Sequence, residues 1–145
     1  MRSNGPAQDE VLSEISGDII SLIEDQNGNH VIQKCFETMP SEKVQFIIEE
    51  VTKNIDSLAF HPYGCRVIQR TLEHSPPEIT APMLNKLMSS AQKCCEDQYG
   101  NYIMQYILEK GPKAEKMTLL DVLKNGFVKL SMNKFARYLN ELGLW

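Results

Sequence analysis

The feature that most constrains this chain is an internal repeat of 36 residues. Four segments align without a gap, and each starts 36 residues after the one before it. They are DQNGNHVIQKCFE from Asp25, HPYGCRVIQRTLE from His61, DQYGNYIMQYILE from Asp97 and NKFARYLNELGLW from Asn133. A repeat of this length indicates a unit that cannot bury its apolar face alone and therefore stacks on its neighbours.

Apolar residues between these segments keep the same register. The first two sets are Val11, Leu12, Ile15, Ile19 and Leu22, then Ile47, Ile48, Val51, Ile55 and Leu58. The next two are Met83, Leu84, Leu87, Ala91 and Cys94, then Leu119, Leu120, Leu123, Phe127 and Leu130. Their spacing is helical, and no alternating polar and apolar run supports a strand. We therefore predict an all-α solenoid.

Helix signals divide each unit into three. In the first segment, Val31, Ile32, Cys35 and Phe36 are spaced to form one buried stripe on an amphipathic helix. Ser41 is placed to cap the next helix, and Gly111-Pro112 ends one helix and precedes another. A third, short helix is expected over residues 55–60.

The phase of the repeat divides residues 1–145 into parts of one array. Residues 6–24 correspond to the rear half of a unit, and residues 25–60, 61–96 and 97–132 are complete units. Residues 133–145 begin a shortened, divergent unit. Solenoids carry polar capping units at their ends, and neither end here has that character, so we expect a piece of a longer array.

Composition limits the classes of function. The net charge of −4 disfavours a nucleic-acid binder, although a curved array can be acidic outside and basic inside. No apolar run reaches the ~20 residues that span a bilayer, and the N-terminus is not a signal peptide, so a cytosolic or nuclear location is expected.

Enzymatic and metal chemistry find no support. The cysteines, Cys35, Cys65, Cys94 and Cys95, do not form paired CxxC motifs, so they are interpreted as small buried side chains and not as zinc ligands. The histidines have no recurring nucleophile or carboxylate partner, and no phosphate-binding loop is present. We expect no catalytic residue, no metal and no cofactor.

Each aligned segment carries three polar side chains at positions i, i+1 and i+4. The triads are Asn29/His30/Gln33, Cys65/Arg66/Gln69, Asn101/Tyr102/Gln105 and Arg137/Tyr138/Glu141. On a helix, residues i and i+4 share a face about 6 Å apart, whereas residue i+1 lies about 100° around the axis. The carboxamides can match the edge of an unstacked base, and a flat side chain at i+1 can stack on it for about 1–3 kcal/mol.

Other polar residues of these segments are assigned to the backbone. Gly28, Gly64 and Gly100 are expected to have a backbone role at the start of each helix. Polar groups of the turn and the helix N-terminus are expected at Asp25, Gln26, Asp97 and Gln98. His61 stands where the other segments have aspartate, which indicates a structural position.

The segments DQNGNHVIQKC, HPYGCRVIQR and DQYGNYIMQYILE resemble consecutive repeats of the Pumilio (PUF) family, over residues 10–136. The resemblance implies a right-handed α-solenoid of three-helix repeats that binds single-stranded RNA, one base per repeat. It implies recognition of mRNA 3′-untranslated regions in the cytoplasm and repression through translational co-repressors or deadenylation machinery. No membrane and no small-molecule substrate are expected.

The resemblance also implies base choices. Asn29 and Gln33 would read uracil with His30 stacking, and Asn101 and Gln105 would read uracil with Tyr102 stacking. Cys65 and Gln69 match the adenine-reading pair, with Arg66 stacking. Because RNA runs antiparallel to the repeats in this family, the core is 5′-UAU-3′ within a UGUA-type element.

The fourth segment departs from the family pattern. Guanine-reading repeats carry Ser and Glu, whereas here Arg137 precedes Glu141, with Tyr138 in the stacking place and Asn140 in an apolar slot. Two alternatives to sequence-specific RNA binding stay open. One is a PUF fragment with little affinity for RNA, and the other is a protein-binding α-solenoid of the HEAT or armadillo kind.

Overall fold

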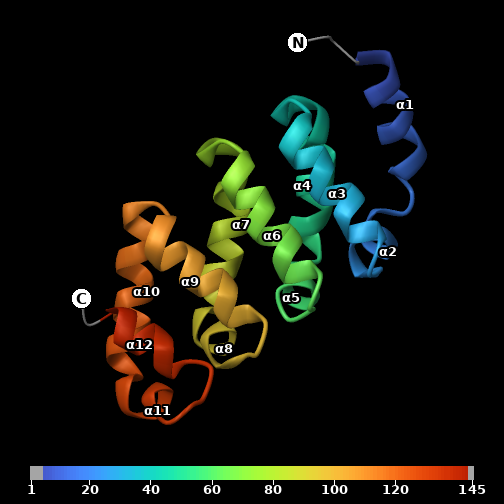
Figure 1. The fold of residues 1–145 in the computed structure, drawn as a ribbon. Helices are drawn as coiled ribbons and strands as arrows, with labels where there is room; N and C mark the ends of the chain where they lie inside the picture. The colour runs from blue at the N-terminus through green and yellow to red at the C-terminus, as the bar shows by residue number, and fades with distance from the viewer. Residues whose placement is uncertain (1–4, 144–145) are drawn as a thin grey trace.

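The computed structural model describes residues 5–143, which form helices and no strand (Figure 1). The helices are α1 (Gly5–Ile15), α2 (Ile19–Glu24), α3 (Gly28–Thr38), α4 (Ser41–Lys53), α5 (Ile55–Leu58), α6 (Gly64–His74), α7 (Pro77–Ser89), α8 (Ala91–Glu96), α9 (Gly100–Lys110), α10 (Lys113–Asn125), α11 (Phe127–Ser131) and α12 (Arg137–Gly143). None of these helices is long and apolar enough to cross a membrane.

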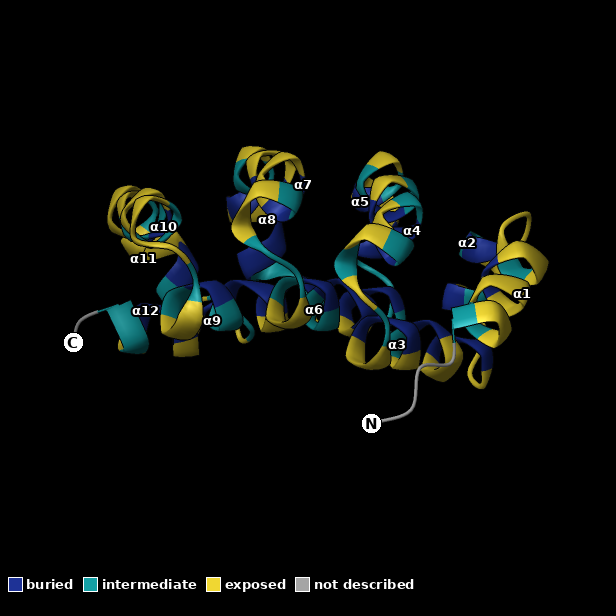
Figure 2. Ribbon diagram, turned by 90° about the horizontal axis from the view of Figure 1, so that it is seen from above, coloured by how far each residue is buried: buried dark blue, intermediate teal, exposed yellow. Residues whose placement is uncertain are grey.

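The helices form a row of three-helix units. Helices α3, α6, α9 and α12 follow one another along one side, and α4, α7 and α10 lie behind them with the short helices α5, α8 and α11 (Figures 1 and 2). Each of α6, α9 and α12 packs against the corresponding helix of the preceding unit. Helices α1 and α2 correspond to the second and third helices of a unit. The predicted all-α solenoid is confirmed.

One continuous apolar core holds the row together. It runs from Leu12 through every unit to Leu139, and its members fall in the aligned slots of the repeat. Ile32, Ile68 and Met104, which share one slot, have no exposed surface. Burying such a side chain contributes roughly 1.5–3 kcal/mol, so the repeated slots account for the stacking of the units.

Two expectations about the first units are wrong. Val31 was expected in the buried stripe of its helix but is exposed. The described residues before α3 form only α1 and α2, so α3 lacks the preceding first helix against which α6, α9 and α12 pack. Ser41 does not cap α4, since the capping position is Pro40 and no side-chain hydrogen bond is made there. The short third helix is confirmed, although it ends at Leu58.

Polar contacts between successive units recur at a constant separation along the outer helices. Lys43 Nζ lies 3.1 Å from Asp9 Oδ1, and Lys86 Nζ donates to the carbonyl oxygen of Thr52 at 3.2 Å. The two residues of each pair are 34 positions apart in the sequence. The first pair joins α4 to α1, and the second joins α7 to α4. The second helix of one unit is therefore positioned in the same way on the unit before it.

All four cysteines are buried and free. Burial raises the pKa of Cys94 and of Cys95 to about 12, and it also raises the pKa of Cys35 and Cys65. We expect the native chain to react with a chromogenic disulfide reagent at neutral pH at least tenfold more slowly than the urea-unfolded chain, since the thiolate is the nucleophile. Rapid modification of all four thiols in the native chain would contradict this burial.

Candidate nucleic-acid interface

Each helix of the inner row begins with the same arrangement of hydrogen bonds. Asp25 Oδ2 accepts from the backbone amides of Asn27 and Gly28 at 2.8 and 2.7 Å. Asp97 Oδ2 accepts from Tyr99 and Gly100, both at 2.8 Å. These bonds satisfy amides that have no partner within the helix. Those from Gly28 and then Asn27 also lower the pKa of the Asp25 carboxyl.

In the other two units His61 and Asn133 accept hydrogen bonds from the amides at the start of the inner helix. His61 Nδ1 accepts from the amides of Tyr63 and Gly64 at 3.1 and 3.2 Å. Asn133 Oδ1 accepts from Phe135 and Ala136 at 2.8 and 2.9 Å. The predicted structural roles of Asp25, Asp97 and His61 are confirmed, and three residue types supply one acceptor geometry.

We expect His61→Ala to lower the free energy of unfolding by about 1 kcal/mol, because two amides at the start of α6 lose their acceptor. His61→Asp should restore most of the loss, since aspartate makes the same bonds at residues 25 and 97. Urea unfolding monitored by circular dichroism measures both variants. An Asp variant as unstable as the Ala variant would show that the imidazole acts through other contacts.

The glycines at these helix starts allow a close approach to the preceding unit. A Cβ atom on Gly28 would lie 2.7 Å from the carbonyl oxygen of Leu22. One on Gly64 would collide with the carbonyl oxygen of Leu58. Both contacts are to backbone, which cannot move aside like a flexible side chain. Helices α3 and α6 are therefore held against the third helix of the preceding unit, which fixes the position of their triads.

The first and third triads form identical hydrogen-bonded pairs. Asn29 Nδ2 donates to the carbonyl oxygens of Asp25 and Gln26 at 2.8 and 3.1 Å, and Gln33 Nε2 donates to Asn29 Oδ1 at 2.7 Å. The pair Asn101/Gln105 repeats these bonds, at 2.8, 3.1 and 2.8 Å. Both asparagines are buried and both glutamines are half-buried. The asparagine thus orients the glutamine, whose amide is the more accessible polar group.

The second triad has a thiol in the place of the asparagine. Cys65 is buried, and its Sγ donates to the carbonyl oxygen of Pro62 at 3.4 Å. Gln69 Nε2 turns to the carbonyl oxygen of Cys65 at 3.2 Å. Desolvation raises the pKa of the Cys65 thiol, which is therefore a neutral contact surface at physiological pH. The position offers a small, weakly polar group where the neighbouring units offer an amide.

The middle member of each triad is exposed. His30, Arg66, Tyr102 and Tyr138 all lie at the surface, and Tyr102 retains 52% of its accessible area. His30, Arg66 and Tyr102 each lie three residues before a half-buried glutamine. Each of these three units therefore presents a flat side chain next to a polar amide. This arrangement can stack a base and hydrogen-bond its edge.

The fourth triad differs in its chemistry. Arg137 Nε lies 4.0 Å from Glu141 Oε1, and both side chains are largely exposed. Position 137 thus carries a charged, exposed guanidinium where the first three triads carry a buried amide or thiol. Asn140, which lies in an apolar slot, is buried and donates from Nδ2 to Phe127 O and Ser131 Oγ at 3.0 and 2.8 Å.

The sequence pattern alone does not distinguish the first member of each triad from the third. In the structure Asn29 and Asn101 are buried and donate to the turn before the helix, which the triad spacing does not indicate. The available signal was the turn itself, because Asp25-Gln26 and Asp97-Gln98 precede these asparagines at a spacing that allows side chain to backbone bonding.

The fold and these helix faces define the class: a solenoid of 36-residue three-helix units with a repeated polar triad. The model of the Pumilio-family RNA-binding repeat matches residues 18–52, 54–88 and 92–124. Together these segments cover more than half of the chain. The chain belongs to the Pumilio (PUF) family.

Solved structures agree with this assignment. A crystal structure of PUF-8 in complex with PBE-RNA is similar at 34% identity and a TM-score of 0.90, over 96% of this chain and 41% of that chain. The Puf3 RNA-binding domain bound to a Cox17 RNA 3′ UTR recognition sequence is similar at 39% identity and a TM-score of 0.88, over 97% of this chain and 43% of that chain. The chain thus spans about two fifths of the domains that it matches. A comparison with curated proteins gave no match.

Proposed function

We propose that this chain binds single-stranded RNA in a sequence-specific manner, with one base at each inner helix. The observation that carries the proposal is the repeated arrangement on α3, α6 and α9. Each helix presents a half-buried glutamine next to a buried amide or thiol, with an exposed flat side chain three residues before the glutamine. The solved PUF domains named above are bound to RNA, which supports the same class of ligand here.

The chemistry of each pair supports a base assignment. Uracil offers a donor and acceptors on its edge, which suit a carboxamide that both donates and accepts, as in Gln33 and Gln105. At Gln69 the neighbouring thiol replaces the second amide and leaves an apolar contact for adenine. We assign uracil to Asn29/Gln33 and Asn101/Gln105 and adenine to Cys65/Gln69, which gives 5′-UAU-3′ within a UGUA-type element.

Stacking is assigned to His30, Arg66 and Tyr102. In the fourth unit Tyr138 keeps the place of a stacking residue, and Glu141 could accept from a guanine edge, but the exposed Arg137 replaces the small side chain of a guanine-reading repeat. We therefore assign this unit the weakest base preference. Through such binding the protein would recognise 3′-untranslated regions of mRNA in the cytoplasm and repress them together with co-repressor or deadenylation machinery.

The direct test is a titration of the chain against two labelled RNAs. One contains UGUAUAUA, and the other has both adenines that stand between uracils replaced by another base, so that no UAU remains. We expect the replacement to weaken binding by about tenfold, because one mismatched base contact is lost. Equal affinities would refute base reading, and no binding to either RNA would favour a PUF fragment without RNA affinity.

Cys65→Asn offers a sharper test of the base assignment. Asn29 Nδ2 donates to the carbonyl oxygens of the residues four and three positions before it. The residues at those positions before Cys65 are His61 and Pro62, and the carbonyl oxygen of Pro62 already accepts from Cys65 Sγ. An asparagine at position 65 would therefore find the same two acceptors. We expect the variant to prefer uracil over adenine at this base by about tenfold, a reversal of the parent preference. Titration against two RNAs that carry adenine or uracil at the base read by this unit measures the switch. Cys65→Ser is the size-matched control without an amide.

A further inference from the structure

A cavity lies between the second and third complete units, residues 61–96 and 97–132. Its volume is about 310 Å³. The turn between α6 and α7 and the turn between α9 and α10 both border it, along the upper edge of the row in Figure 1. The second unit contributes Leu72, Ser75 and Leu84 to its walls, and the third contributes Tyr106, Ile107 and Lys110.

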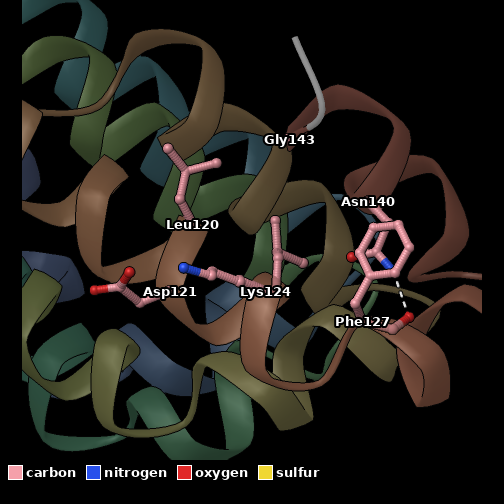
Figure 3. A pocket seen from close by; sticks show the side chains of 7 residues that line it. Leu120, Asp121, Lys124, Phe127, Asn140 and Gly143 are labelled. Atoms are coloured by element: carbon pink, nitrogen blue, oxygen red, sulfur yellow. Dashed lines mark hydrogen bonds between the residues drawn. The ribbon is translucent and has the colours of Figure 1, made fainter.

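This cavity differs in its setting from another of similar size. A cavity of about 300 Å³ lies beside Phe127 and Asn140 (Figure 3). No described helix follows α12, so that cavity has a described unit on one side only. The cavity between the second and third units is bounded by a complete unit on each side. Its shape is therefore set by residues inside the array and not by the limits of the described chain.

Two small side chains near the end of α6 leave this space. Leu72 and Ser75 occupy the slots that Phe36 and Met39 occupy one unit earlier. Phe36 is buried, and Met39 packs against the core. Leucine and serine are smaller than phenylalanine and methionine, so the second unit lacks apolar volume that the first unit has. Protein interiors are close-packed, and an unfilled space between two regular units therefore indicates a place for a partner group.

Hydroxyl groups lie beside the apolar walls. Ser75 Oγ is buried, and none of the described residues forms a hydrogen bond with it. Tyr106 is half-buried, and burial followed by the negative charge of Glu73 raises the pKa of its hydroxyl, which therefore stays protonated. A protonated hydroxyl donates to a carbonyl oxygen, the acceptor that a peptide backbone offers at every residue. An apolar cavity with a few polar groups is typical of a binding site.

The rim of the cavity is cationic. Lys110 lies one turn after Tyr106 on α9, it is exposed, and none of the ion pairs among residues 5–143 involves it. The carboxylate of Glu73 is already paired, since Arg70 Nη1 lies 3.0 Å from its Oε1. Pro112, which precedes α10 at the same rim, makes no side-chain cap. The unsatisfied amides at that helix start add positive potential, so the rim favours an anionic group.

We propose that this cavity binds a peptide segment of a partner protein, with one large apolar side chain inside the cavity and an acidic residue beside it. The apolar side chain fills the space that Leu72 and Ser75 leave, a backbone carbonyl accepts from Ser75 Oγ, and the carboxylate pairs with Lys110. Anchors of this kind dominate the affinity of many interfaces. The triads lie towards the N-terminal ends of α6 and α9 and the cavity at their C-terminal ends, so this site goes beyond RNA binding.

Selection from a phage-displayed library of random short peptides, with the whole chain as bait, tests the proposal. The filled variant, Leu72→Phe with Ser75→Met, serves for counter-selection. We expect the selected peptides to share a leucine, methionine, phenylalanine or tryptophan next to an aspartate or glutamate. Synthetic copies, measured by fluorescence anisotropy, should bind the filled variant at least about tenfold more weakly than the parent. Failure to select any peptide, or equal affinity for both chains, would overturn the proposal.

The filled variant carries side chains that the chain itself accommodates at positions 36 and 39. It should therefore fold, and it should unfold at the same or a higher urea concentration than the parent, because filling a cavity is stabilising. Its affinity for RNA should match that of the parent, since the triads of α6 and α9 are unchanged. A loss of RNA binding together with peptide binding would show a disturbed unit, and Lys110→Glu then decides.

Lys110→Glu changes only an exposed side chain at the rim, so the variant should fold. The selected peptides should bind it about fivefold more weakly, because an attraction between exposed charges becomes a repulsion. Lys124→Glu is the matched control, because Lys124 is also exposed but lies beside the other cavity, and it should bind peptides like the parent. Unchanged affinity of Lys110→Glu would overturn the proposal.

Octanoate distinguishes a small ligand from a peptide, because it has an apolar body and a carboxylate but no peptide backbone. We expect it to bind the parent at least about tenfold more weakly than the selected peptides do. Octanoate that binds the parent and not the filled variant, in the absence of any selected peptide, would assign the cavity to a small carboxylate and overturn the proposal of a protein partner.

Discussion

Replacing both Arg66 and Tyr102 with alanine is expected to weaken RNA binding by about a hundredfold or more. Each stacked base is worth about 1–3 kcal/mol by alanine substitution, and a loss of 1.4 kcal/mol is tenfold in affinity. The two side chains lie on different units, so their losses should add approximately. Fluorescence anisotropy of a labelled RNA containing UGUAUAUA, at protein concentrations that reach weak binding, measures the effect.

Tyr102→Phe is the matched control for this prediction. It keeps the ring and removes only the hydroxyl group, so binding should change by less than about threefold if stacking carries the interaction. Both positions are exposed, and the alanine variant should therefore unfold at nearly the same urea concentration as the parent. Unchanged affinity of a folded alanine variant would remove these residues from the RNA-binding face.

Gly64→Ala is expected to lower the free energy of unfolding by about 3 kcal/mol, at the upper end of the range for overpacking a close-packed site. Its Cβ atom would collide with the carbonyl oxygen of Leu58 and lie 2.9 Å from the Cα atom of that residue. Both are backbone atoms, so α6 has to move away from α5 to make room. Urea unfolding followed by circular dichroism measures the loss, and RNA titration reports the displaced triad.

Gly17→Ala separates this steric effect from the general effect of the substitution. A Cβ atom on Gly17 meets nothing within 4 Å, and no glycine of the described residues has a positive φ. Stability should therefore stay the same or rise by up to about 1 kcal/mol, because alanine restricts the unfolded chain. Equal losses in the two variants would rule out the contact with Leu58 as the cause.

The solenoid could be predicted from the sequence because the same pattern of apolar positions recurs every 36 residues. A slot that is apolar in four units, such as that of Leu12, Ile48, Leu84 and Leu120, indicates a buried helical position far more strongly than one apolar residue does. The grouping of Asn29 with Gln33 and of Cys65 with Gln69 followed from the same register. The base choices came from the family resemblance and stay predictions.

The register could not predict what happens where a neighbour is missing. Val31 is the same residue type as the buried Val67 in the same slot, yet it is exposed. Whether this slot is buried depends on the neighbouring unit that covers it and not on the residue alone. Asn140 is the reverse case, since a polar residue in an apolar slot is buried with its Nδ2 bonded to Phe127 and Ser131. Such local partners depend on three-dimensional packing, which a repeat pattern does not specify.

The hydrogen bond between Asn29 and Gln33 has a consequence for the entropy of recognition. A free glutamine side chain samples many rotamers, and ordering a rotamer-rich side chain on binding costs about 0.5–1.5 kcal/mol. Gln33 and Gln105 are already held by buried asparagines, so this ordering takes place when the chain folds and is not repeated for each ligand. Gln69 is held instead by the carbonyl oxygen of Cys65, a bond at 3.2 Å compared with 2.7 and 2.8 Å. The three units therefore differ in the group that preorganises the glutamine, which is a buried side-chain amide in the first and third and a backbone carbonyl in the second.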